Sequence, residues 1–417
     1  MFGFLKGRLV FVRLCMIAAT AGLVAIGVLT LYAVGHPADP SPTANTSELT
    51  GFWKKQLVFA GVAGAGFIFA NLIHYRRLGT LSYWMYGLIL LLLAVLLVDK
   101  FIDIPFVPVR NSSRRWIRVG TASTFVLVQP SEFCKVIYIL ALAWYLRYRS
   151  NYRSFRALIG PFLLTLLPMV LILAEPDLGT VMLMMPVLFT MLFVAGAKVK
   201  HLLLVVLMAL LVSPLLWYKM HPYQRRRISA VLLQNKAVQE KAQENPTVGR
   251  LLVGEKFSLK KWRRDWGFNL IRSKYAIASG GATGQGYRRG PFIKYNFLPY
   301  RYNDFVFASI AHQWGFAGCA VLFGLFVIII MAGLEIAANN IDPFGRLISV
   351  GIMTMFIVEV FVNVSMTVGL MPITGLTLPF VSYGGSSLLV SAIAIGLLNN
   401  VGRCRPFSVA PKAFEEQ

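Results

Sequence analysis

The sequence predicts an all-α polytopic membrane protein with about ten transmembrane helices. Hydrophobic residues make up 57% of the 417 residues and charged residues only 14%, and the mean hydropathy is +0.65. Soluble globular domains carry about 45–50% apolar and about 25% charged residues. The apolar excess lies in runs of roughly 18–28 residues, the length that crosses a bilayer core about 30 Å thick. These observations exclude a soluble globular protein.

The whole chain, residues 1–417, is predicted to form a single integral membrane domain. The expected spans are residues 9–35, 56–73, 82–98, 132–148, 157–174, 179–197, 199–217, 305–333, 344–371 and 380–402. The first apolar run is too long for a secretory signal and is not followed by a clear cleavage site, so we expect it to remain as a helix. A long loop, residues 218–304, joins the seventh and eighth spans, and a short tail follows at 403–417.

Lys and Arg in the short connections predict the orientation. There are 15 on the side of the N-terminus and 7 on the opposite side. Basic residues collect on the cytoplasmic side of short loops, whereas loops longer than about 60 residues do not follow this rule. Both termini and the tail are therefore expected in the cytoplasm, and the loop 218–304 outside it.

The basic charge of the chain indicates an anionic partner. The net charge is +24, and the loop 218–304 alone holds 18 Lys and Arg against 5 acidic residues. Because these charges lie between membrane spans, anionic lipids or an anionic lipid-linked substrate fit better than nucleic acid. The loop is either a solvated surface that docks a partner or a cradle for phosphate. The four cysteines have no CxxC spacing, which argues against a disulfide framework or a zinc site.

Ionisable residues at membrane depth are costly and are candidates for function. Glu132 and Lys135 stand at i, i+3 on one face at the start of the fourth span. They are either a neutralised pair that lets the helix enter the bilayer or a polar anchor under a substrate cavity. Glu359 and Asn363, at i, i+4, predict a polar face of the ninth span that points into the bundle.

Acidic residues in two turns are candidates for acid–base chemistry. Glu175 and Asp177 flank Pro176 between the fifth and sixth spans, where they could act as acid and base, bind a cation, or in the case of Asp177 cap the next helix. Asp304 follows Arg301 where the long loop re-enters the membrane. It suits a general base at the water–lipid boundary and also an N-cap of the eighth span.

Two small-residue segments have a functional and a structural interpretation. The run from Ser279 through Gly280 and Gly281 to Tyr287 could offer backbone N–H groups to a phosphate or form a flexible turn. The run 379–387 contains Ser382 and Ser386, whose hydroxyls could line a polar cavity, while its small residues favour close helix packing.

Several of these motifs together resemble the SEDS family (shape, elongation, division and sporulation). The matching stretches are Arg114-Arg115-Trp116-Ile117, Gln129-Pro130-Ser131-Glu132-Phe133-Cys134-Lys135, Glu175-Pro176-Asp177-Leu178-Gly179-Thr180, Pro222-Tyr223-Gln224-Arg225-Arg226-Arg227-Ile228, the glycine-rich run from Ser279, Asp304-Phe305-Val306-Phe307 and Met371 to Ser387. They occur in the family's order from the third span onward, so the resemblance rests on independent motifs.

The resemblance implies a ten-helix glycosyltransferase of the bacterial cytoplasmic membrane that polymerises lipid II into peptidoglycan. Asp304 matches the family's essential aspartate, taken as the base that deprotonates the acceptor sugar 4-hydroxyl, with undecaprenyl pyrophosphate leaving. The implied substrate-binding residues are Glu132, Lys135, Arg114, Arg115, Glu175, Asp177, Arg225, Arg227, Ser279, Gly280, Gly281, Ser382 and Ser386. A divalent cation, Mg²⁺ or Mn²⁺, is a candidate cofactor. The implied partners are a class B penicillin-binding protein and other proteins of the division or elongation complex.

The chain departs from the family pattern at a few positions. Tyr302 and Asn303 replace the usual His-Thr, His312 and Gln313 replace a Glu pair, and Glu359 replaces a Gln. Extra basic sequence lies near 245–266. The turn at Glu175 and the motif at 375–379 resemble the division (FtsW-like) subgroup more than the elongation (RodA-like) one.

Two other functions compete with polymerisation. A flippase for lipid-linked precursor would depend on Glu132, Lys135 and Glu359 more than on Asp304. A scaffold of the division complex would not need the Asp304 carboxylate.

Overall fold

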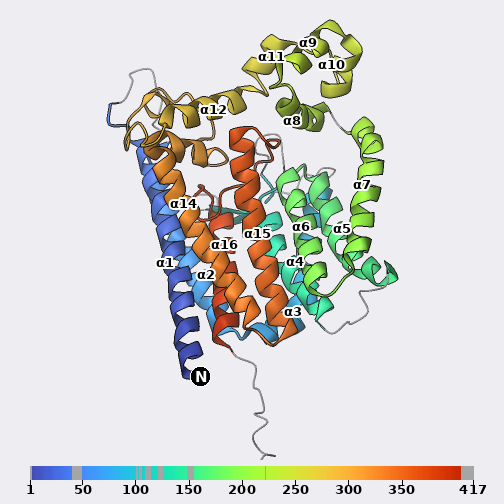
Figure 1. The fold of residues 1–417 in the computed structure, drawn as a ribbon, viewed down its shortest axis with the longest axis vertical. Coiled ribbons are helices and arrows are strands. Elements are labelled where there is room, and N and C mark those ends of the chain that lie inside the picture. Colours follow the sequence, from blue (N-terminus) through green and yellow to red (C-terminus); the bar gives the residue numbers. More distant parts are fainter. Residues whose placement is uncertain are drawn as a thin grey trace, which may run out of the picture.

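The computed structural model is a bundle of long helices that carries a group of short helices at one end (Figure 1). It describes residues 2–39, 49–99, 102, 106–108, 114–120, 125–147, 155–220 and 222–404. Each predicted span has a matching helix. These are α1 (Phe2–Gly35), α2 (Phe52–Leu72), α3 (Tyr75–Val98), α4 (Pro130–Leu146), α5 (Ile159–Ala174), α6 (Leu178–Val194), α7 (Val199–Lys219), α14 (Val306–Ala338), α15 (Pro343–Val368) and α16 (Gly385–Arg403).

Eight of the helices in the described chain are long and apolar enough to cross a membrane on length and composition alone. The other two, α4 and α6, have 17 residues each. At 1.5 Å per residue such a helix is about 25 Å long, slightly less than a bilayer core. Both pack against α15, so they form part of the interior of the bundle.

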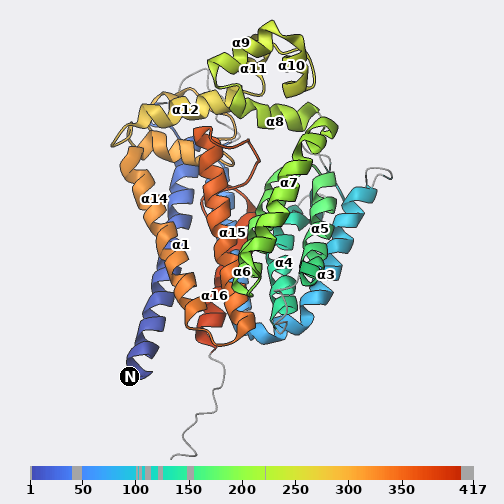
Figure 2. The same cartoon turned by 45° about the vertical axis from the view of Figure 1, so that its right-hand side comes forward.

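Burial separates the central helices from the peripheral ones. Of the most apolar 18-residue stretch, 72% is buried in α15 and 67% in α16, against 6% in α7. The leucines and valines of α7 therefore face outward, where lipid would cover them. Figure 1 shows α7 at the right-hand side of the bundle, and in Figure 2 α15 lies between α14 and α7.

The ends of the central helix α15 follow from local sequence. Asp342 is its N-cap and accepts a hydrogen bond from Phe344 N at 3.4 Å, and Pro343 occupies the first helical position, where its missing N–H costs nothing. Gly369, at φ 94°, ends the helix in the left-handed conformation that glycine adopts without strain.

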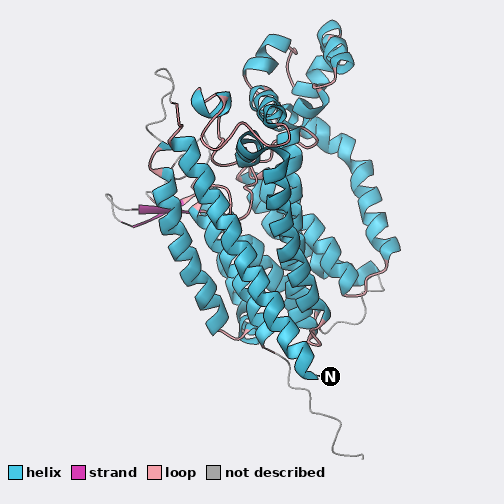
Figure 3. Cartoon of the chain, turned by 60° about the vertical axis from the view of Figure 1, so that its left-hand side comes forward, coloured by secondary structure: helices cyan, strands magenta, loops and turns pink. Residues whose placement is uncertain are grey.

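A small hairpin adds strand to the otherwise helical fold. Strands β1 (Ile117–Gly120) and β2 (Phe125–Val128) pair antiparallel, with Ile117 opposite Val128. Their Val, Ile and Phe residues favour strand. Figure 3 shows the hairpin, in magenta, at the side of the bundle. In the chain it lies between α3 and α4.

The described part of the long loop 218–304 is helical. It folds into α8 (Pro222–Leu232), α9 (Lys236–Glu244), α10 (Pro246–Val253), α11 (Leu259–Arg264), α12 (Phe268–Gly280) and α13 (Pro291–Lys294). Residues Leu233, Ala242, Val253, Phe257 and Trp262 form a hydrophobic cluster separate from the core of the bundle. The extra segment 245–266 is therefore part of a folded subdomain, which we call the α9–α11 cap.

The cap and α12 lie at one end of the bundle, here called the loop end, while α1 begins and α16 ends at the other (Figure 1). The start of α1 and the end of α16 thus lie on the same side, as an even number of membrane spans requires. Of the predicted tail, residues 405–417 lie outside the described residues.

Candidate functional site

Asp304 lies at the loop end, in the turn that leads into α14. Helix α14 begins at Val306 with Phe305 as its N-cap and has no side-chain cap. The N-cap interpretation of Asp304 is therefore wrong. Within the described chain its carboxylate accepts no hydrogen bond, and the side chain is partly exposed. A carboxylate that is partly exposed and has no protein donor is available to a substrate.

The surroundings of Asp304 adjust its acidity. Burial raises the pKa of Asp304 to about 6; the positive charges of Arg227 and Arg115 oppose this rise, and the negative charge of Asp177 adds to it. A base is most effective when its pKa lies near the working pH. Asp304 is thus ionised at neutral pH and still basic enough to accept a proton.

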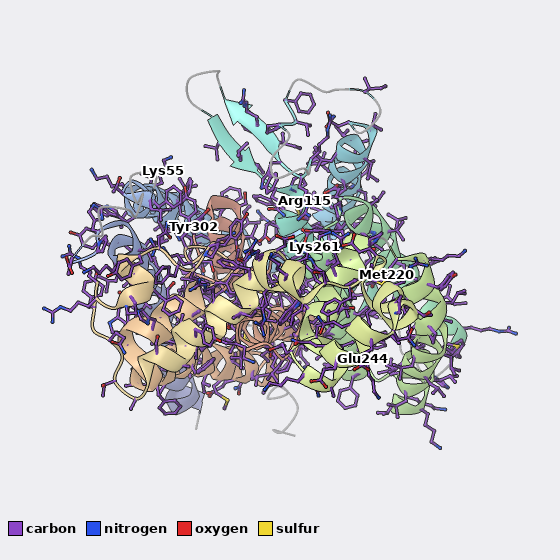
Figure 4. All side chains as sticks on the ribbon, turned by 90° about the horizontal axis from the view of Figure 1, so that it is seen from above. Lys55, Arg115, Met220, Glu244, Lys261 and Tyr302 are labelled. Atoms are coloured by element: carbon purple, nitrogen blue, oxygen red, sulfur yellow. The ribbon has the colours of Figure 1, made fainter. Side chains whose placement is uncertain are left out.

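The two arginines near Asp304 come from distant parts of the chain. Arg115, just before β1, donates to Pro176 O at 2.7 Å, and Arg227, on α8, lies over the Tyr223 ring at 4.7 Å. Figure 4 looks onto the loop end and shows Arg115 near the base of the hairpin. The charges of both arginines favour the ionised form of the Asp304 carboxyl.

The neighbouring Arg301 does not pair with Asp304, although the sequence puts them three residues apart. Its guanidinium is 1% exposed and donates to Phe292 O at 2.8 Å, Ile293 O at 3.2 Å and Val34 O at 3.2 Å. It thereby ties the end of α1 to α13. Burial lowers the pKa of Arg301 to about 10, which leaves it charged.

Two other predicted arginines are bound away from Asp304. Arg114 forms an ion pair with the buried Asp99, Nη1 to Oδ2, at 2.9 Å. Arg225 donates to Tyr218 O at the junction of α7 and α8. Both contacts hold segments of the fold together, and neither brings the guanidinium to the carboxylate of Asp304.

The acidic turn before α6 has a structural role. Asp177 is the N-cap of α6 and accepts from Thr180 N at 3.3 Å and Thr180 Oγ1 at 3.1 Å, which confirms the cap interpretation. Ser131 Oγ at 2.9 Å and Gln129 Nε2 at 3.2 Å also donate to it. Glu175 is 1% exposed, so its carboxyl does not open to the surface.

A buried group of three charges lies in the centre of the bundle. Lys135 Nζ is 2.8 Å from Glu132 Oε2 on α4 and 2.6 Å from Glu359 Oε1 on α15. The pairing of Glu132 with Lys135 is confirmed, and the polar face of α15 does point inward. Glu359 as a second partner was not foreseen, because nothing in the local sequence relates α4 to α15.

Part of the glycine-rich run is committed to contacts with α14, which favours the turn interpretation of the sequence. Helix α14 breaks at Gly315, which has φ 61°. The run closes this break by four backbone hydrogen bonds, Gln285 N to His312 O, Gly286 N to Gln313 O, Phe316 N to Gly281 O and Ala317 N to Ala282 O, at 2.9–3.1 Å. The N–H groups of residues 285 and 286 are thus already used, and at membrane depth a broken helix requires such partners.

Close packing explains the first residues of that run. A Cβ atom on Gly280 would lie 1.9 Å from Ala311 O. Ser279 Oγ donates to Ala276 O and lies 2.7 Å from His312 Nδ1. Ser279, Gly280 and Gly281 therefore pack against or hydrogen-bond to α14.

The serines of the run 379–387 connect segments. Ser382 Oγ accepts from Leu378 N and donates to Asn303 O, both at 2.8 Å. Ser386 Oγ accepts from Gln129 N at 3.2 Å and donates to Leu127 O at 3.3 Å. These bonds favour the packing interpretation.

Two buried amides brace the same region: Gln56, which sequence reasoning missed, and Asn363, which it placed on the inward face of the ninth span without a partner. Gln56, on α2, donates to Ser382 O at 3.2 Å, and Asn363 donates to Asp304 O at 3.0 Å. The available signal was a polar residue inside an apolar run, which indicates a buried hydrogen bond but not the residue that completes it.

The described residues contain no group of three or more His, Cys, Asp or Glu side chains arranged to hold a metal ion. Asp177 accepts from four protein donors, on Gln129, Ser131 and Thr180, while its negative charge still acts on Asp304.

The fold and the site define a polytopic membrane protein with a partly exposed carboxylate, under the charge of two arginines, at one end of its helix bundle. The family model of the cell cycle proteins FtsW, RodA and SpoVE matches residues 13–405. The chain belongs to this family, which confirms the resemblance seen in the sequence.

Similar proteins carry the names of more than one subgroup. The chain is 31% identical to the peptidoglycan glycosyltransferase RodA of Treponema pallidum, covering 91% of this chain and 94% of that protein. It is 34% identical to stage V sporulation protein E of Bacillus subtilis (84% and 87% covered) and 31% to a probable peptidoglycan glycosyltransferase FtsW of Geobacter metallireducens (93% and 94%). These names do not separate division from elongation.

Solved structures share the fold. A structure described as showing structural coordination of polymerization and crosslinking by a peptidoglycan synthase complex matches with a TM-score of 0.71 at 30% identity, covering 93% of this chain and 96% of that one. RodA of Thermus thermophilus matches with a TM-score of 0.62 at 27% identity, covering 94% and 97%. The multi-span helical fold expected from the sequence is confirmed.

Proposed function

We propose that this chain, a peptidoglycan glycosyltransferase by family, polymerises lipid II with Asp304 as the general base. The observation that carries the proposal is the Asp304 carboxylate at the loop end, which is partly exposed and accepts no hydrogen bond from the described residues. Burial raises its pKa to about 6, and the charges of Arg227 and Arg115 act on it. This arrangement combines a proton acceptor with positive charge, and glycosyl transfer from a pyrophosphate needs both.

In the proposed step Asp304 takes the proton of the acceptor sugar 4-hydroxyl. The hydroxyl oxygen attacks the anomeric carbon of the growing strand, and a new C–O bond forms. The bond from that carbon to undecaprenyl pyrophosphate breaks, and the leaving oxygen keeps the electron pair. Arg115 and Arg227 supply the positive charge that stabilises the departing pyrophosphate.

The proposal puts the loop end outside the cytoplasm and both termini inside. The excess of Lys and Arg in short connections on the side of the N-terminus, 15 against 7, supports this orientation. The enzyme would then act at the outer face of the bacterial cytoplasmic membrane, where its basic cap meets the aqueous space.

We further propose septal synthesis with a class B penicillin-binding protein as partner. The turn Glu175-Pro176-Asp177 and the motif at 375–379 support the division subgroup. Depleting the protein from its host distinguishes the roles, because loss of septal synthesis gives filaments and loss of elongation gives rounded cells. Rounded cells would overturn the septal assignment and leave the polymerase in place.

Polymerisation of labelled lipid II by purified protein with its class B partner, resolved on a gel, tests the enzymatic proposal. Asp304→Asn should abolish polymer while the folded protein remains. Asp265→Asn, an exposed acid on the same loop, is the matched control and should retain activity. Polymer from Asp304→Asn would refute the base assignment. Transport of lipid II without polymer, lost on Glu359→Gln in a protein that stays folded, would instead establish the flippase.

A further inference from the structure

Asn363 is a fully buried residue on α15 whose side chain joins two irregular segments. Its Nδ2 donates to Asp304 O at 3.0 Å and to Leu376 O at 2.7 Å. Because both neighbours are carbonyl oxygens, the atom that faces them must be the amide nitrogen. One side chain thus connects the turn that carries Asp304 to the segment after α15.

These segments depend on such side chains because they have no regular structure of their own. Tyr300, in the turn before Asp304, has φ 52°, and Phe380 has φ 66°. The segment anchored by Asn363 also lies next to the carboxylate, since a Cβ on Gly375 would be 3.8 Å from Asp304 Oδ2. A shift of either segment would move the carboxylate.

The other end of the amide side chain, Asn363 Oδ1, is a buried acceptor without a partner among the described residues. An unpaired buried acceptor costs about 1–3 kcal/mol. An apolar side chain of similar size would avoid this cost but would leave the carbonyls of Asp304 and Leu376 without this donor, so the amide is explained by the two bonds it donates.

We propose that Asn363 is a positioning residue that fixes the direction of the Asp304 carboxylate through the backbone of its turn. The proposal rests on the proposed role of Asp304 as the base. Asn363 itself has no exposed surface and does not contact substrate. Its loss should therefore lower the rate of the chemical step and leave binding of lipid II intact.

The test compares Asn363→Leu with a matched control, Asn400→Leu. Asn400 on α16 is equally buried, and its Nδ2 donates to Ala70, Asn71 and Ile73 carbonyls at 2.8–3.1 Å, in contact with α2 and the start of α3. For each folded variant we would measure kcat for polymerisation, Kd for lipid II and the thermal midpoint. Asp304→Asn runs alongside.

Asn363→Leu should lower kcat about 10- to 100-fold, the effect of a misplacement of about 1 Å, and change Kd less than about twofold. Asn400→Leu should lower the thermal midpoint without changing kcat per folded protein. An unchanged kcat for Asn363→Leu would overturn the proposal. A fall of both kcat and affinity for lipid II that is the same in Asn363→Leu and Asn400→Leu would also overturn it.

A second variant covers failure to fold. Asn363→Asp keeps the shape of the side chain but turns a carboxyl oxygen toward both carbonyls, so the two hydrogen bonds are lost. If Asn363→Leu does not fold, the same kcat and Kd outcomes for Asn363→Asp test the proposal. If neither variant folds, the role is structural and the proposal is wrong. Activity of Asp304→Asn would remove the base assignment itself, whereas an inactive Asp304→Asn with an active Asn363→Leu removes only the positioning role.

Discussion

Replacing Lys135 by Met should destabilise the protein strongly, because one ammonium neutralises two buried carboxylates. Lys135 Nζ lies 2.8 Å from Glu132 Oε2 and 2.6 Å from Glu359 Oε1, and the lysine and Glu359 side chains are 2% and 3% exposed. Met has a similar volume, so packing changes little. The change leaves Glu132 and Glu359 close together with no counter-ion.

The magnitude follows from the cost of an uncompensated buried charge. Removing one partner of a buried ion pair costs about 3–5 kcal/mol, and here two carboxylates lose their partner. Glu359→Gln should lower the free energy of unfolding by less than about 1 kcal/mol. The amide oxygen still accepts a hydrogen bond from Lys135, and Glu132 still neutralises the charge of Lys135. Replacing all three residues by apolar ones should recover most of the stability that Lys135→Met loses.

Thermal unfolding in detergent, followed by the fraction that stays monodisperse, measures these differences. The expected order of stability is wild type and Glu359→Gln together, the triple variant close below, and Lys135→Met far lower. A Lys135→Met protein as stable as wild type would show that the charges do not depend on one another. Equal losses from Glu359→Gln and Lys135→Met would also refute the reasoning.

Three further predictions concern the loop end. Polymerisation should require ionised Asp304, so the initial rate should rise as the pH increases through about 6. Arg227→Gln removes a positive charge that favours the carboxylate, so it should move this rise to higher pH. A pH–rate profile in which Arg227→Gln leaves the rise unmoved would contradict the prediction. Gly280→Ala should cost about 1–3 kcal/mol because its Cβ meets Ala311 O, whereas Gly61→Ala, with nothing within 4 Å, should not lower the thermal midpoint. Arg301→Met should lower that midpoint by leaving three carbonyls unpaired, while the exposed Arg289→Met should not.

The sequence by itself determined the spans, since an apolar run and its ends are local properties. The predicted start of the fourth span at 132 lies within two residues of Pro130, where α4 begins, and the predicted start of the ninth at 344 lies next to Pro343. Glu132 and Lys135 could be paired because i, i+3 residues meet on any helix. Motif order was also enough to identify the family.

Only the tertiary structure decided which groups meet across the bundle. Lys135 and Glu359 are 224 residues apart, and Asn363 and Asp304 are 59 apart; no local pattern relates them. Arg301, near Asp304 in sequence, turns to backbone carbonyls, while Arg115 and Arg227 act on the carboxylate instead. The glycine run likewise gained its role only once α14 broke beside it. The physical reason is that hydrophobicity fixes which segments enter the membrane, whereas the packing of those segments fixes which polar side chains find partners.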